Sequence, residues 1–77
     1  MKEEVINFII QAVCDIGYPV SLFEDSSLVN DAGLDSLDIV DLSAMIEDNY
    51  NIRISDSEYG VFKETIADVA DLIISKL

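Results

Sequence analysis

The sequence predicts an all-α fold: a small four-helix bundle with three main helices, a short third helix and a long first loop. Three segments repeat apolar residues at helical spacing, at about residues 2–16, 36–50 and 65–77. The second of these contains neither Gly nor Pro between residues 36 and 49. Only Ile52-Arg53-Ile54 alternates like a strand, and three residues without a partner strand do not make a sheet.

The first helix is predicted over residues 2–16. Its polar face is distinct from a broad apolar arc, and Cys14 lies at the edge of the polar face as an exposed thiol. Gly17 suits the C-cap, and Tyr18-Pro19 prevents the helix from continuing. The arc consists of Val5, Ile6, Ile9, Ala12, Val13 and Ile16.

A connection of seventeen residues follows, from Tyr18 to Leu34. Loops of this length are uncommon in small domains unless they are anchored or functional. The sequence favours anchoring, with a short helical turn near residues 21–24. The expected anchors are Val20, Leu22, Phe23, Leu28 and Val29.

The second helix is expected to begin at Ser36, with Asp35 as its N-cap, and to end near Tyr50-Asn51. Its apolar residues fall into two stripes, of which Ile39, Leu42, Ile46 and Tyr50 face the core. The other stripe consists of Leu37, Val40 and Ala44, with Asp41 and Asp48 on one side and Glu47 on the other. Apolar residues bordered by like charges predict a docking surface for a basic, partly apolar partner. A helix buried on two sides is the alternative.

Beyond this helix, Ile52 and Ile54 are expected to insert into the core from an extended linker. A short helical turn is predicted from Asp56 to about Val61, stopped by Gly60, with Tyr59 and Phe62 closing the core. The last helix starts at Thr65, which forms a capping box with Asp68. Its buried stripe consists of Ile66, Val69, Ala70, Ile73 and Leu77.

Length and charge restrict the possible partners. Seventy-seven residues predict one domain, and 51% hydrophobic residues exclude a disordered acidic tail. Sixteen acidic and four basic residues give a net charge of −12, which argues against binding to nucleic acid or an anionic membrane. One cysteine permits no internal disulfide, and no apolar segment approaches membrane-spanning length. Because the opening residues do not resemble a signal peptide, we expect a cytoplasmic protein.

Catalysis is disfavoured because the chain contains no histidine to activate Ser36, which stands between acidic residues. Ser36 is better suited as an exposed acceptor that another enzyme modifies, at a helix N-terminus that favours phosphate. Asp31, Asp35, Asp38 and Asp41 do not have the spacing of an EF-hand loop. No specific metal site is predicted, although weak binding of divalent cations by these carboxylates is left open.

The stretch Asp31-Ala32-Gly33-Leu34-Asp35-Ser36-Leu37-Asp38, followed by Val40-Asp41-Leu42, resembles the prosthetic-group site of acyl carrier proteins. The resemblance covers nearly the whole chain. It includes the long first loop, the Ile52-Arg53-Ile54 segment and the Thr65-Ile66-Ala67-Asp68-Val69 start of the last helix.

This resemblance implies that residues 1–77 form a single acyl carrier domain, a right-handed bundle of four helices. It implies that Ser36 carries 4′-phosphopantetheine, transferred from coenzyme A by a phosphopantetheinyl transferase with Mg²⁺. The thiol of this arm would hold acyl groups as thioesters. The implied partners are acyl-transferring and acyl-modifying enzymes with basic docking patches, and the chain is expected to be a monomer and not itself an enzyme. The matching docking positions are Asp35, Leu37, Asp38, Val40, Asp41, Ala44, Glu47 and Asp48.

Some residues depart from the family pattern, including Ala32, Ala44, Arg53 and Ser55. These differences leave Ser36 intact, but they leave open whether the pathway is fatty-acid synthesis or a specialised, polyketide-like one. Two alternatives also stand: an acidic interaction module without a prosthetic group, and an aminoacyl or peptidyl carrier. The latter is disfavoured because Asp35 occupies the position where that branch usually has histidine.

Overall fold

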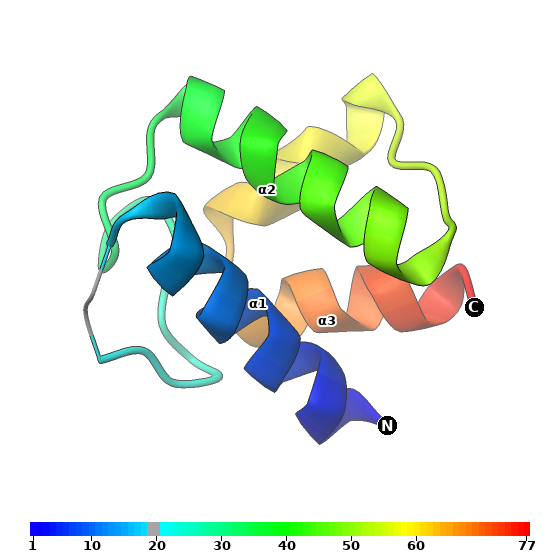
Figure 1. Ribbon diagram of the computed structural model, residues 1–77, viewed down its shortest axis with the longest axis horizontal. Helices are drawn as coiled ribbons and strands as arrows, with labels where there is room; N and C mark the ends of the chain where they lie inside the picture. The colour runs from blue at the N-terminus through cyan, green and yellow to red at the C-terminus, as the bar shows by residue number, and fades with distance from the viewer. Residues whose placement is uncertain (19–20) are drawn as a thin grey trace.

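The computed structural model describes residues 1–18 and 21–77. In these residues the chain forms three α-helices and one 3₁₀-helix: α1 (Lys2–Ile16), α2 (Ser36–Tyr50), η1 (Asp56–Lys63) and α3 (Ile66–Ser75) (Figure 1). Helix α1 packs against both α2 and α3, and η1 packs against α3. The predicted all-α fold, with its short third helix and long first loop, is confirmed.

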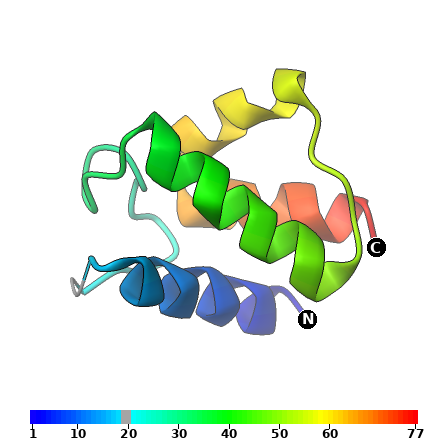
Figure 2. The ribbon, with the colours of Figure 1, turned by 45° about the horizontal axis from the view of Figure 1, so that its top comes forward.

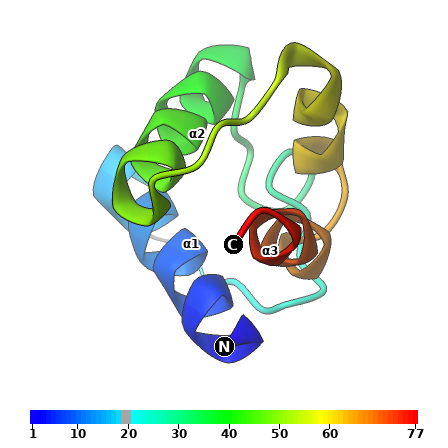
Figure 3. The same cartoon turned by 90° about the vertical axis from the view of Figure 1, so that its right-hand side faces the viewer.

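The core lies between the four helices, and every helix contributes to it. Figure 3 shows α3 nearly end-on, with α1 and α2 to its left and η1 above it. The helices bury the apolar faces that their periodicity predicts, and the loop and linker add further side chains. The completely buried members include Ile9, Val13, Leu28, Leu42, Ile46, Phe62, Ile66, Val69 and Ile73.

The long loop between α1 and α2 is held by the start of α3. The backbone carbonyls of Glu24 and Ser26 accept hydrogen bonds from the amides of Ala67 and Ile66, at 2.8 and 2.9 Å. Ser27 forms an isolated antiparallel bridge with Thr65. Segments about forty residues apart in the chain therefore lie side by side, and this attachment holds residues 24–27 of the loop against the start of α3.

Two of the predicted loop details are wrong. Phe23 does not anchor the loop, because its side chain is 66% exposed. The predicted helical turn at residues 21–24 is absent from those residues, and a turn instead brings the Phe23 carbonyl within 3.0 Å of the Ser26 amide. Leu22 and Leu28 are buried and Val29 packs against the core, as predicted, whereas Val20 lies outside the described residues.

The 3₁₀-helix η1 is longer than predicted. It continues through Gly60 to Lys63, so Gly60 does not stop it. A glycine in a helix costs only about 0.5–1 kcal/mol, which the burial of the adjoining Phe62 offsets. At the other end, the Glu58 carboxylate accepts hydrogen bonds from the Ser55 amide and hydroxyl, at 2.8 and 2.9 Å.

The C-terminus is tied to η1 by an ion pair. The Lys76 ammonium lies 2.9 Å from the Glu58 carboxylate. Hydrogen bonds from Ser55 and the Lys76 ammonium together hold the pKa of Glu58 at about 2. Leu77, which follows this lysine, is 55% exposed and does not join the buried stripe as predicted, because α3 has already ended at Ser75.

The remaining boundaries agree with the prediction. Asn51 ends α2 in the left-handed conformation, at φ 55°. Ile54 is buried and Ile52 is half-buried, as expected of a linker that contributes to the core. The Thr65 hydroxyl accepts a hydrogen bond from the Asp68 amide at 3.2 Å and so caps α3. None of the helices in the described residues combines the length and the apolar character needed to cross a membrane.

Candidate functional site

Ser36 is placed by a sharp turn that leads into α2. Gly33 has φ +84°, a conformation in which any L side chain would be strained. The chain then buries Leu34 and becomes extended at Asp35, with φ −94° and ψ −177°. Ser36 is the first residue of α2 and is exposed. Figure 2 shows the corner at which the loop enters this helix.

The N-terminus of α2 is closed by a reciprocal capping box. The Asp35 carboxylate accepts a hydrogen bond from the Asp38 amide at 2.9 Å. The Asp38 carboxylate accepts one from the Asp35 amide at 3.2 Å. These bonds fix the backbone on both sides of Ser36 and leave its side chain at the positive end of the helix dipole.

Asp38 has a further hydrogen-bond partner, which no sequence pattern indicates. The Tyr18 hydroxyl, at the start of the loop, donates a hydrogen bond to Asp38 Oδ2. This bond, with the backbone hydrogen bond at Asp35, holds the pKa of Asp38 below its usual value. The same bond to Asp38 raises the pKa of Tyr18. Asp38 is therefore half-buried and fixed, whereas its neighbours Asp35 and Asp41 are exposed.

Because of the hydrogen bond between Tyr18 and Asp38, we expect the free energy of unfolding to depend on pH in both the acidic and the alkaline range. The lowered pKa of Asp38 contributes stability above its unfolded value, near 3.8, and that stability is lost as the pH falls through the folded pKa. The raised pKa of Tyr18 contributes stability below its unfolded value, near 10.0, which is lost as the pH rises through the folded pKa. In Tyr18→Phe, we expect the pKa of Asp38 to move upward, measured by the pH titration of its carboxyl ¹³C resonance. An unchanged titration would contradict the bond.

The second stripe of α2 lies on the surface. Leu37 is 74% exposed and Val40 is 50% exposed, although both are apolar. Asp41, Ala44 and Asp48 are exposed beside them. This arrangement excludes the alternative of a helix buried on two sides and leaves an apolar stripe between carboxylates at the surface. Docking at these positions remains a prediction.

Glu47 differs from the other acidic residues of α2. It is half-buried, and its Oε2 accepts a hydrogen bond from the Ile54 amide at 2.8 Å. The stripe therefore ends at a carboxylate that also fixes the linker. Beyond it, Ala44 and Asp48 share a surface groove with Arg53, so a basic residue lies next to the predicted docking acids. The sequence did not indicate this proximity.

A groove of about 410 Å³ lies next to Ser36, between α2 and η1. Ile39 and Val40 line it from α2, so the groove continues the exposed stripe toward the hydroxyl of Ser36. Near this groove, the Ser43 hydroxyl of α2 lies 3.2 Å from the Tyr59 hydroxyl of η1 and links the two helices. The lining residues are Ser36, Ile39, Val40, Asp56, Tyr59, Gly60 and Lys63.

These residues fit a phosphate-linked arm better than a catalytic centre. The hydroxyl of Ser36 is exposed and can be reached by another enzyme, the helix N-terminus favours a phosphodiester, and the apolar groove can receive a flexible organic chain. Within residues 1–18 and 21–77, no group of three or more His, Cys, Asp or Glu residues is arranged to hold a metal ion.

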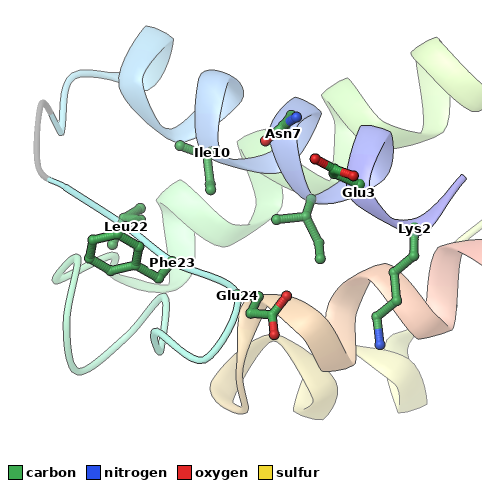
Figure 4. A pocket seen from close by; sticks show the side chains of 8 residues that line it. Lys2, Glu3, Asn7, Ile10, Leu22, Phe23 and Glu24 are labelled. Atoms are coloured by element: carbon green, nitrogen blue, oxygen red, sulfur yellow. The ribbon is translucent and has the colours of Figure 1, made fainter.

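A third groove, of about 590 Å³, lies between the start of α1 and the loop (Figure 4). It shares no lining residue with the groove next to Ser36. Leu22 and the exposed Phe23 line it from the loop, and Ile10 lines it from α1. At its edge, the Lys2 ammonium lies 3.0 Å from the Asp71 carboxylate.

Comparison with known proteins finds a matching family and several similar proteins. Residues 7–73 match the phosphopantetheine attachment site family. An acyl carrier protein from Coprothermobacter proteolyticus is 45% identical over 53 residues, which are 69% of this chain and 63% of that protein. One from Wolinella succinogenes is 42% identical over 55 residues, or 71% and 67% of the two chains. One from Buchnera aphidicola is 43% identical over 56 residues, or 73% and 69%.

The aligned part of the chain thus spans about two thirds of the length of these relatives. The chain therefore belongs to the phosphopantetheine attachment site family and, within it, to the acyl carrier proteins.

Proposed function

We propose that residues 1–77 act as a single acyl carrier domain and that Ser36 is the residue that carries 4′-phosphopantetheine. The observation that carries this proposal is the position of Ser36: an exposed hydroxyl at the first residue of α2, beside an apolar groove. The family match supports an attachment site within residues 7–73, and Ser36 lies inside that range.

The residues around Ser36 prepare it to be modified by a separate enzyme. Gly33 turns the chain, and the capping box of Asp35 and Asp38 fixes the start of α2, so the hydroxyl projects from a rigid backbone. The dipole of α2 offsets the repulsion between these carboxylates and an attached phosphodiester. The arm, when attached, supplies a thiol that holds acyl groups as thioesters.

The surface of α2 suits partners that bind briefly. Exposed carboxylates speed the encounter with a basic patch, and a narrow apolar stripe adds only modest affinity. The proposed partners are a phosphopantetheinyl transferase and the acyl-transferring and acyl-modifying enzymes of fatty-acid or polyketide-like synthesis, in the cytoplasm. The proposed docking residues are Asp35, Leu37, Asp38, Val40, Asp41, Ala44, Glu47 and Asp48.

Charge reversal at Asp41 tests the docking surface. Because Asp41 is exposed and has no capping role, Asp41→Lys is expected to leave the fold intact. We expect it to lower kcat/KM for loading by a phosphopantetheinyl transferase by roughly tenfold at low salt, and by less at high salt. Asp15→Lys, an equal charge change at an exposed position of α1, is the control. Equal rates for the two variants would contradict docking at Asp41.

The attachment of phosphopantetheine to Ser36 is tested by enzymatic modification followed by mass spectrometry. The protein is incubated with coenzyme A, Mg²⁺ and a broad-specificity phosphopantetheinyl transferase, and its intact mass is measured. We expect a gain of one phosphopantetheine group, which fragmentation of the peptide assigns to Ser36. A folded sample that gains no mass would refute the carrier proposal and favour an acidic interaction module with no prosthetic group.

A further inference from the structure

Lys63 is the basic residue that lines the groove beside Ser36. It is the last residue of η1, on the side of the groove opposite α2. Its backbone is held in place by two contacts of the same helix. The preceding Phe62 is completely buried, and Glu58 forms an ion pair with Lys76. An exposed ammonium on a flexible stem is thus anchored within the same groove as the hydroxyl of Ser36.

The other three basic residues lie away from this groove. Lys2 pairs with Asp71 at 3.0 Å, and Lys76 pairs with Glu58 at 2.9 Å. Arg53 lines the separate groove at the C-terminal end of α2. Among residues 1–18 and 21–77, Lys63 is therefore the one basic residue that lines the groove of Ser36, in a protein with a net charge of −12.

A phosphodiester on Ser36 would add a negative charge where several already lie. Asp35 and Asp38 flank it along α2, Asp41 is exposed one turn further on, and Asp56 lines the same groove from η1. The dipole of α2 offsets part of this repulsion, within the first turn only. An ammonium group that lines the same groove would offset more of it, because opposite charges attract even in water.

We propose that Lys63 binds the phosphodiester of the arm attached to Ser36, from the opposite side of the groove that both residues line. This inference rests on the proposed function, because it requires the arm. It assigns Lys63 a ligand, whereas the alternative role is a favourable charge at the C-terminal end of η1, which would act equally before and after loading.

A thermodynamic cycle separates these two roles. The melting temperature is measured before and after loading for the wild type, Lys63→Gln, Lys63→Arg and Arg53→Gln, and mass spectrometry confirms that each sample is loaded. We expect loading to lower the melting temperature by about 2 °C more in Lys63→Gln than in the wild type, at low salt. Lys63→Arg keeps the charge and is expected to behave as the wild type. Arg53→Gln removes one charge at the other groove and serves as the matched control.

The ³¹P resonance of the loaded protein provides a second measurement that does not depend on stability. It is expected to shift in Lys63→Gln and to stay in place in Arg53→Gln, and the difference should shrink in 0.5 M salt as screening increases. If the change in melting temperature on loading and the ³¹P resonance are the same in Lys63→Gln and Arg53→Gln, the inference about Lys63 is wrong while the carrier proposal stands. A wild type that cannot be loaded would instead refute the proposed function.

Discussion

Ser36→Ala is expected to abolish the gain of phosphopantetheine completely, while the wild type is fully loaded under the same conditions. The reason is chemical: the substitution removes the only oxygen atom of the side chain that could be joined to the phosphate. Intact-protein mass spectrometry after incubation with coenzyme A, Mg²⁺ and the transferase gives the result directly. The effect is all-or-none, larger than any expected from a docking residue.

The loss should not come from unfolding. Ser36 is exposed, and the N-cap of α2 is Asp35, whose carboxylate accepts a hydrogen bond from the Asp38 amide at 2.9 Å. We therefore expect Ser36→Ala to change the free energy of unfolding by no more than about 0.5 kcal/mol. Ser57→Ala, at an exposed serine of η1, is the control for specificity and should load normally. Loading that persists in Ser36→Ala would place the attachment at another serine.

The helix boundaries that could be predicted are those with local chemical signals. Asp35, Asn51 and Thr65 act within three or four residues of their own position, through a cap or a left-handed backbone, so their effect is visible in the sequence. The two faces of α2 could be predicted for the same reason, since helical periodicity alone separates Leu42 from Val40.

The details that could not be predicted depend on contacts between distant segments. Phe23 has an apolar side chain in an anchored loop, yet its ring is exposed. The hydrogen bonds that the Glu24 and Ser26 carbonyls accept from the start of α3 hold the part of the loop that follows Phe23. The length of η1 follows from the burial of Phe62, which outweighs the local cost of Gly60.

The candidate site shows the same division. The placement of Ser36 after an N-cap follows from the sequence, and the structure puts it at the start of α2. The hydrogen bond from Tyr18 to Asp38 spans twenty residues and has no sequence signal. The groove that Ser36 and Lys63 share lies between α2 and η1 in the folded chain, so the sequence alone does not indicate that these two residues line one groove.

Phe62→Ala is expected to have the largest effect on stability. Phe62 is completely buried on η1, and its ring lies 6.0 Å from that of Tyr59. Truncating a buried phenylalanine costs about 3–5 kcal/mol, through lost burial and the cavity that remains. A chain of this length is expected to be stable by only about 4–12 kcal/mol. Urea denaturation followed by circular dichroism should therefore show a midpoint far below that of the wild type.

Phe23→Ala is the matched control, because it makes the same chemical change at a side chain that is 66% exposed. We expect it to cost less than about 1 kcal/mol. If Phe62→Ala is unfolded even without urea, Phe62→Leu keeps most of the volume and should still show a loss of about 1 kcal/mol. Similar losses at positions 23 and 62 would mean that the loop packs against the core as tightly as η1 does.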